Sequence, residues 1–230
     1  MTVANGSRRT AASLALALLF GPGLVAQSDQ GEWISLFDGS TLAGWEGNTA
    51  YFRVENGAIV GGTRADPIPR NEFLCTTEQF DDFIVRLQFR LDDGVNSGVQ
   101  IRSKRIPGSN EVIGYQADLG DGWWGALYDE SRRNRALVRP DFAAVDRVLE
   151  RAGWNDYEVA ADGPRIRLFI NGQRTIDYTE TEPDIEQRGH LCLQIHSGPP
   201  GEVRFRNISL KRLTITPRNP DPLVSTAPSR

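Results

Sequence analysis

Short segments in which apolar and polar residues alternate constrain the fold of this chain more than any other feature. Such alternation is the two-residue period of a β-strand with one buried face. The clearest examples are residues 86–90, 99–102, 115–119 and 191–196. Tight-turn dipeptides such as Asn56-Gly57 lie between other segments of this kind, and Asn-Gly in that setting is a strong hairpin signal. With roughly a dozen short strands, the pattern predicts an all-β sandwich or barrel.

The polar faces of the four clearest segments carry an unusual set of side chains. An ordinary solvent face offers Thr, Lys, Glu and Ser, whereas these offer Gln, Arg, Asp and His, with a Gln in every segment. Gln and Arg each make several directed hydrogen bonds, and Asp and His add acid–base capacity. If the four segments share a sheet, their polar faces form one surface suited to a hydroxylated ligand. This surface indicates a sugar.

The remaining elements follow from the same reasoning. Further strands are expected at residues 33–37, 52–54, 58–61, 154–160, 165–170, 174–178 and 203–210. Residues 141–151 fit a short amphipathic helix that begins with Asp141 as its N-terminal cap. There is no internal repeat and no clear linker, so one domain over residues 27–213 is expected.

The two ends of the chain differ from this domain. Residues 1–26 contain Arg8-Arg9, an apolar run over residues 11–20 and a small residue at Ala26, which is the pattern of a secretory signal peptide. A run of this length is short for a membrane span. Residues 214–230 are rich in proline and poor in large apolar groups, so a disordered tail is expected. The protein is therefore expected to be exported, to the periplasm or the outside of a bacterium.

The net charge limits the kinds of binding partner that are expected, and the cysteine content limits the possible disulfides. The chain carries 26 basic and 30 acidic residues, a net charge of −4, and removal of the leader arginines makes it more acidic. Such a charge disfavours nucleic acid or anionic lipid as the main partner, and nothing in the sequence identifies a protein partner. The two cysteines, Cys75 and Cys192, are free to form a disulfide after export. Because Cys192 falls on a polar face by alternation, a free thiol facing the ligand is an equal alternative.

Several motifs, taken together in their order and spacing, resemble a known family. They are Phe80-Asp81-Asp82-Phe83, Asn96-Ser97-Gly98-Val99, Gly114-Tyr115-Gln116-Ala117-Asp118, Leu193-Gln194-Ile195-His196 and Phe205-Arg206-Asn207-Ile208. Over about residues 33–213 the chain resembles the 3-keto-disaccharide hydrolase domain, also described as a 3-keto-glucoside 1,2-lyase/hydratase domain. The resemblance implies a concanavalin A-like jelly-roll sandwich of two antiparallel sheets with one short helix. It also implies activity on oxidised sugars. Two positions depart from many relatives, because Gln88 and Gln116 stand where those relatives carry Glu.

The implied chemistry assigns roles to three residues. A keto group at C3 of a sugar makes the C2 proton acidic, so that a base removes it and the C1 substituent leaves by elimination. His196 is the first candidate for this base, since its neutral form is available near neutral pH. Asp118 is a candidate base, metal ligand or partner that orients His196. Arg102 is the natural clamp for the enolate oxygen, with a cross-strand ion pair to Asp118 as its structural alternative.

Other residues are candidates for holding the oligosaccharide or glycoside substrate. They are the amides Gln100, Gln116 and Gln194, the aromatic residues Trp123, Trp124 and Tyr128, and the loop residues Glu130 and Arg132. Aromatic rings stack on the C–H faces of sugars, and of two adjacent Trp we expect one in the core and one at the site. A divalent metal held by Asp118, His196 and Glu130 is a further hypothesis. The competing interpretation is a non-catalytic carbohydrate-binding module, which the two Glu-to-Gln departures favour.

Overall fold

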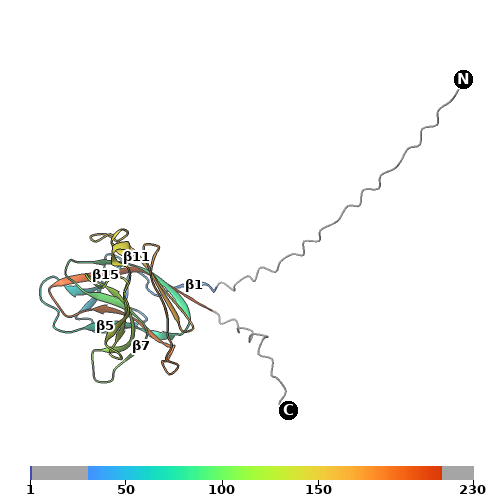
Figure 1. The fold of residues 1–230 in the computed structure, drawn as a ribbon. Helices are drawn as coiled ribbons and strands as arrows, with labels where there is room; N and C mark the ends of the chain where they lie inside the picture. The colour runs from blue at the N-terminus through green and yellow to red at the C-terminus, as the bar shows by residue number, and fades with distance from the viewer. Residues whose placement is uncertain (2–30, 214–230) are drawn as a thin grey trace, which may run out of the picture.

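Two antiparallel β-sheets packed face to face make up the part of the chain that the structure describes (Figure 1). The structure, a computed structural model, describes Met1 and residues 31–213. The predicted tail at 214–230 and all of the predicted signal peptide except Met1 lie outside the described residues. Within that described part, no helix has the length and apolar character needed to cross a bilayer.

The first sheet, called sheet A, has eight strands. In spatial order they are β13 (Gln173–Thr179), β12 (Arg165–Ile170), β11 (Asn155–Asp162), β6 (Phe83–Leu91), β15 (Gly201–Arg212), β4 (Ala58–Thr63) and β3 (Phe52–Glu55), with β1 (Trp33–Ser35) paired to β15. The predicted hairpin at Asn56-Gly57 is confirmed as β3 and β4. Asn56 and Gly57 both adopt the positive φ that such a turn requires.

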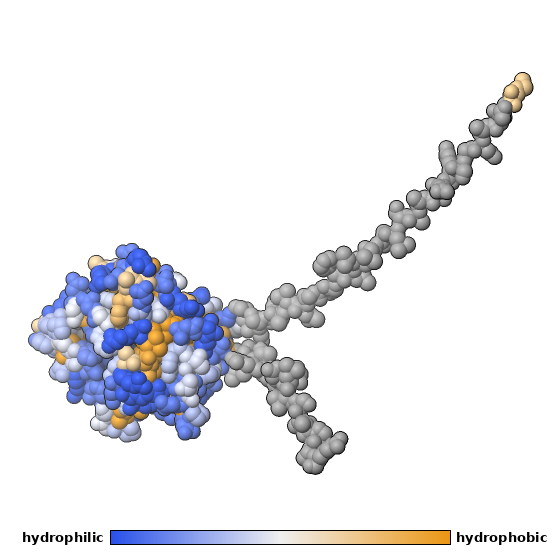
Figure 2. Space-filling view, viewed as in Figure 1, coloured by the Kyte–Doolittle hydropathy of each residue, from blue (hydrophilic) through white to orange (hydrophobic). Residues whose placement is uncertain are grey.

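The second sheet, called sheet B, has seven strands. In spatial order they are β10 (Arg135–Val138), β9 (Leu127–Glu130), β8 (Val112–Leu119), β7 (Ser97–Arg105), β14 (Gly189–Ile195), β5 (Glu72–Phe80) and β2 (Trp45–Glu46). The two sheets bury one core between them, to which β6 contributes Val85 and Phe89, and β7 contributes Val99 and Ile101. The surface seen in Figure 2 is correspondingly mostly hydrophilic, with a narrow apolar strip across it. The predicted jelly-roll sandwich is therefore the observed fold.

The predicted helix exists but is shorter than expected. α1 spans Phe142–Asp146, and the carboxylate of Asp141 caps it by accepting hydrogen bonds from the backbone N–H groups of Ala143 and Ala144. Val145 is its one buried residue. A single apolar contact gives little reason for a second turn, because packing supplies most of a helix's stability.

The four alternating segments do not all share one sheet, contrary to the sequence-based expectation. The strands β7, β8 and β14 lie side by side in sheet B, but β6 lies in sheet A. Gln88 therefore points away from the core on the opposite side of the sandwich from Gln100, Gln116 and Gln194. Alternation identifies which face of a strand is buried, but it does not say which sheet the strand joins.

The β7–β8 hairpin bends back over the outer face of sheet B. The pairing of β7 with β8 shifts register between Ile101 and Lys104, and Arg102 in this bulge has a φ of 49°. Beyond the bend, Nδ2 of Asn110 at the hairpin tip donates a hydrogen bond to the carbonyl of Asn71 (2.6 Å). Bulges of this kind bend a strand and redirect its side chains, and here the bend gives the outer face a wall.

The two cysteines form a disulfide under this hairpin. Cys75 on β5 and Cys192 on β14 are direct cross-strand neighbours and are bonded to each other. They pack with Phe73 and with Val112 of the hairpin in a small buried cluster separate from the main core. The free-thiol alternative is thus excluded.

Candidate functional site

A hollow of about 440 Å³ lies on the outer face of sheet B. Six of its lining residues were predicted from the sequence, namely Gln116, Asp118, Trp123, Tyr128, Glu130 and His196. Five others were not, namely Asn71, Gly94, Val95, Asn96 and Asp121. The missed residues lie in loops, where alternation gives no information about direction. Only Asn96 had a signal, since it precedes Ser97-Gly98 in one of the family motifs.

Asp118 is the most perturbed acid in the hollow. Its side chain is almost fully buried, and its Oδ1 accepts a hydrogen bond of 2.6 Å from Nε2 of Gln116. Its Oδ2 is buried with no protein partner among the described residues. Burial is the main cause that raises the pKa of Asp118 to about 8, and the charge of Glu130 adds to the effect. At neutral pH Asp118 is therefore mostly protonated and able to donate a proton.

A chain of hydrogen bonds fixes the orientation of this acid. Oγ of Ser103 donates to Oε1 of Gln100 (2.9 Å), and Nε2 of Gln100 donates to Oε1 of Gln116 (2.6 Å). Gln116 in turn donates to Asp118. Since each amide accepts through oxygen and donates through nitrogen, the direction of every bond is set. Asp118 is left with one committed oxygen and one free oxygen.

His196 follows β14 and is half-buried at the edge of the hollow. Its Nδ1 lies 2.6 Å from the carbonyl oxygen of Ser197. A carbonyl only accepts hydrogen bonds, so Nδ1 carries the ring proton. In the neutral ring Nε2 then holds the lone pair, which is the form that a general base requires.

The opposite wall carries a second acid and two aromatic rings. Burial, followed by the charge of Glu111, raises the pKa of Glu130 to about 7. The rings of Trp123 and Tyr128 meet edge to face with centroids 5.8 Å apart. Both rings line the hollow and are half-buried. The wall therefore offers apolar ring surface beside a carboxyl group, which suits the mixed surface of a sugar.

The two adjacent tryptophans separate as predicted. Trp124 is buried in the core, where its ring stacks on Phe89 with centroids 6.0 Å apart. Its Nε1 donates a hydrogen bond to Asp121 at the rim of the hollow (3.1 Å). Trp124 is thus a support for the site and not part of its lining.

Arg102 does not lie in the hollow, which corrects the prediction that it clamps the enolate. Its fully buried guanidinium pairs with Asp82 at 2.7 Å and donates to the carbonyl of Gly163 at 2.7 Å. The bulge at Arg102 turns the side chain away from the polar face. The alternative of an ion pair with Asp118 is equally wrong, and Arg102 instead anchors the corner at which the β7–β8 hairpin bends.

Three more predicted ligands lie behind the hollow. Gln100 and Gln194 are fully buried, and both amide atoms of Gln194 lack a protein partner among the described residues. Arg132 pairs with Asp129 at 2.7 Å and stacks over the ring of Tyr115. None of the three is among the residues that line the hollow, so their contact with a ligand is not direct in this conformation.

The described residues do not form a set of metal ligands. Within residues 31–213, no group of three or more His, Cys, Asp or Glu side chains is placed to hold a metal ion. The predicted set of Asp118, His196 and Glu130 lines a common hollow without converging on one point.

Comparison with known proteins identifies the family. The family model described as a 3-keto-alpha-glucoside-1,2-lyase-like domain matches residues 32–211. The chain belongs to this family. The 3-keto-alpha-glucoside-1,2-lyase-like family is a carbohydrate-active family, as the motifs indicated. No curated protein matches the chain.

Solved structures share the fold of this family member at low sequence identity. A protein of Parabacteroides distasonis, provisionally described as a glycosyl hydrolase, is 20% identical with a TM-score of 0.61, over 80% of this chain and 94% of that one. Carbohydrate-binding module CBM66 of Bacillus subtilis is 13% identical with a TM-score of 0.51, over 80% and 98%. The β-glucanase of Bacillus licheniformis is 9% identical with a TM-score of 0.53, over 81% and 99%. These likenesses show the sandwich fold.

Proposed function

We propose that the protein is an exported enzyme that cleaves 3-keto-glycosides by removing the C2 proton and eliminating the C1 substituent. The observation that carries the proposal is the pairing, in one hollow, of a histidine whose Nε2 is free to accept a proton with two carboxyl groups of raised pKa. His196 offers a lone pair at Nε2, while Asp118 and Glu130 hold protons close to neutral pH. Sites that place groups of separated acidity together are suited to acid–base catalysis.

In the proposed elimination, His196, Asp118 and Glu130 each have one role. Nε2 of His196 takes the proton from C2, and the electrons of that C–H bond form an enolate with the C3 carbonyl. The protonated Oδ2 of Asp118 donates a hydrogen bond to the enolate oxygen, a role for which a carboxylic acid kept neutral by burial is suited. The enolate then reforms the carbonyl and a C1=C2 double bond while the C1–O bond breaks. Glu130 gives its proton to the departing oxygen. In the hydration that follows, the Glu130 carboxylate takes a proton from the water that adds to C1, and His196 returns its proton to C2, so that net hydrolysis restores both groups.

Export is part of the proposal, and the Cys75–Cys192 disulfide supports it. Structural disulfides persist mainly in oxidising compartments, so this bond agrees with the secretory signal predicted over residues 1–26.

Incubation of the purified protein with a 3-keto-glucoside and with its unoxidised parent tests the chemistry, with products followed by mass spectrometry. We expect cleavage of the keto-sugar alone, and a loss of about 10² to 10⁴ in kcat/KM for His196→Gln, as for removal of a general base. Turnover of the parent sugar at a similar rate would contradict the elimination mechanism.

A carbohydrate-binding module is the second candidate, and the amide at position 116 favours it. Gln116 cannot serve as a base, so the site has one carboxylate fewer than the Glu-bearing relatives that the sequence resembles. Binding of the keto-sugar by the native protein without any turnover, and unchanged in His196→Gln, would establish this module in place of the enzyme.

A further inference from the structure

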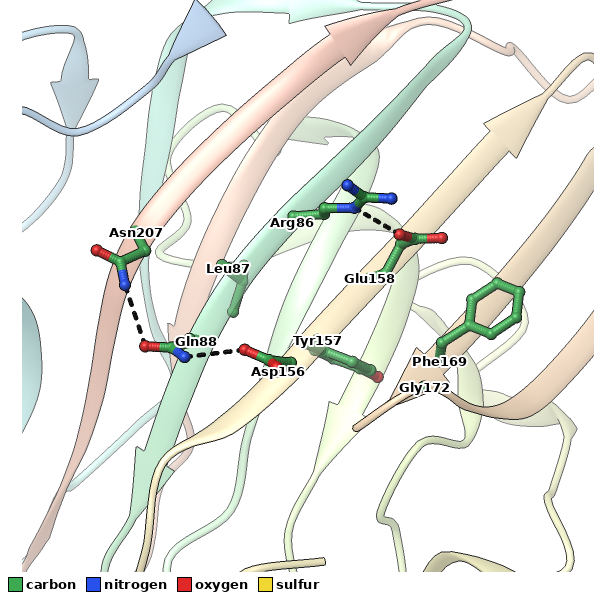
Figure 3. Close-up of a pocket in the computed structure, with 9 residues that line it drawn as sticks. All are labelled: Arg86, Leu87, Gln88, Asp156, Tyr157, Glu158, Phe169, Gly172 and Asn207. Atoms are coloured by element: carbon green, nitrogen blue, oxygen red, sulfur yellow. Dashed lines mark hydrogen bonds and ion pairs between the residues drawn. The ribbon is translucent and has the colours of Figure 1, made fainter. Parts of the chain in front are cut away.

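The outer face of sheet A carries a second hollow, on the opposite side of the sandwich from the proposed active site. Its volume is about 560 Å³. Its lining residues, drawn in Figure 3, are Arg86, Leu87, Gln88, Asp156, Tyr157, Glu158, Phe169, Gly172 and Asn207. It is the larger of the two hollows, yet its lining contains no histidine. Its two carboxylates, Asp156 and Glu158, are held by Gln88 and Arg86, so its chemistry favours binding over acid–base catalysis.

Polar side chains cross this hollow in a row that spans three strands (Figure 3). Nδ2 of Asn207 on β15 donates to Oε1 of Gln88 on β6 (3.1 Å), and Nε2 of Gln88 donates to Oδ1 of Asp156 on β11 (2.9 Å). Each amide has two N–H groups and each carboxylate has two oxygens. The row therefore keeps both donors and acceptors for a ligand while its members hold one another in place.

The position of Asn207 depends on an irregularity of β15. The pairing of β15 with β6 shifts register between Arg206 and Ser209, and Asn207 has a φ of 54°. A residue other than glycine in this region is uncommon, and bulges are frequent beside binding sites because they redirect side chains. Here the bulge places the Asn207 amide in line with Gln88.

Aromatic rings lie within the hollow and against arginines in it or next to it. Phe169 on β12 is half-buried within the hollow. Trp33 is exposed, and Cζ of Arg86 lies 4.6 Å from the centroid of its ring. Cζ of Arg206 lies 3.9 Å from the ring centroid of Trp154. Ring faces near hydrogen-bonding groups match the C–H faces and hydroxyl groups of a sugar.

The lining of the hollow carries little net charge and no excess of positive charge. Arg86 pairs with Glu158 at 2.6 Å, and the remaining charged residue of the lining is the carboxylate of Asp156, which accepts from Gln88. Arg206 next to the hollow donates from Nε to the same Gln88 (2.8 Å). An anionic ligand would find no excess of positive charge here. A neutral ligand with many hydroxyl groups would find both donors and acceptors.

We propose that this hollow is a second sugar-binding site, which holds a neutral oligosaccharide chain independently of the reaction on sheet B. Because the two sites lie on the outer faces of opposite sheets, a glycan bound here leaves the first site open. The site would keep the protein on a polysaccharide while the first site accepts small oxidised glycosides.

Native gel electrophoresis in the presence of one polysaccharide at a time tests this site. The probes are dextran, amylose, mixed-linkage β-glucan, xylan and galactomannan, with alginate as the charged comparison. We expect at least one neutral polysaccharide to retard the protein, and Asp156→Ala to weaken this retardation about tenfold, as for the loss of one or two hydrogen bonds. Asn207→Gly is the second variant, because glycine accepts the positive φ and the fold is kept.

Two matched control variants test whether the polysaccharide binds in this hollow and not elsewhere on the protein. Asp177→Ala removes an exposed carboxylate of β13 outside the hollow, and Asp118→Asn alters the proposed active site, so both should be retarded like the native protein. The proposal is overturned if no neutral polysaccharide retards the protein, or if Asp118→Asn abolishes the retardation while Asp156→Ala and Asn207→Gly retain it. Neither result depends on whether the protein cleaves a keto-sugar.

Discussion

At the scale of single residues, Asp118 shows how its surroundings set the chemistry of a carboxyl group. Gln116 donates a hydrogen bond to one carboxyl oxygen of Asp118, burial disfavours the negative charge of this carboxyl group, and Glu130 adds a second negative group nearby. The sequence placed Asp118 on a polar strand face, which is correct, but it left open whether the group acts as a base, a metal ligand or a partner that orients His196. Burial raises the pKa of this group, since only the folded chain removes the carboxyl group from water.

The raised pKa of Asp118 makes stability depend on pH. A carboxyl group whose folded pKa of about 8 exceeds its ordinary value of 3.8 contributes its full stability below pH 4. That contribution is lost as the pH rises towards 8, because the unfolded chain releases the proton first. Asp118→Asn should remove this dependence and stabilise the fold above pH 8 by about 1–3 kcal/mol.

Urea unfolding at pH 4, 6 and 8.5 measures this effect. The exposed Asp93→Asn provides the control and should follow the native protein at every pH. A native unfolding free energy that does not fall relative to that of Asp118→Asn between pH 4 and 8.5 would show that Asp118 ionises normally in the fold.

At the scale of strands and hairpins, close backbone approaches set the geometry of the site. Gly98 on β7 lies opposite Gln194 on β14 and Asp118 on β8. A methyl group at Gly98 would lie 2.6 Å from Cγ of Gln116, which is too close for any real contact. The absence of a side chain at this position lets Gln116 lie across β7 and reach Asp118. The Asn-Ser-Gly motif is therefore explained by packing around the acid.

Gly98→Ala should consequently damage activity more than stability. The new methyl group displaces Gln116 and breaks its bonds to Gln100 and Asp118. We expect kcat/KM for the keto-glycoside to fall about 10- to 100-fold, with a stability loss of about 1–3 kcal/mol. Steady-state kinetics and urea unfolding measure the two effects. Gly153→Ala is the control, since its new methyl group would meet Cβ of Glu150 at 3.1 Å in a loop away from the site, and it should leave the kinetics unchanged. Unchanged kinetics in Gly98→Ala would refute the link.

At the scale of the whole molecule, the Cys75–Cys192 disulfide joins residues 117 positions apart. Because it links neighbouring strands β5 and β14 under the β7–β8 hairpin, it holds the centre of sheet B on the side of the site. A cross-link over a long loop stabilises a protein mainly by restricting the unfolded chain.

The double variant Cys75→Ala, Cys192→Ala should lose about 2–4 kcal/mol of unfolding free energy. Denaturant unfolding of the oxidised native protein gives the reference, and the native protein reduced with dithiothreitol should match the double variant. Equal unfolding midpoints for oxidised and reduced protein would show that the bond contributes nothing to stability.

The sequence by itself determined the fold class, most strand positions, the hairpin turns and six residues of the candidate site. These features depend on local order along the chain, since alternation defines the faces of a strand and Asn-Gly defines a tight turn. The tertiary structure alone decided that β6 joins sheet A, that Cys75 bonds to Cys192 and that Arg102 turns away from the site. Each of these depends on pairing register and on bulges between strands distant in sequence. The energy of such contacts arises only when the two sheets close on one core.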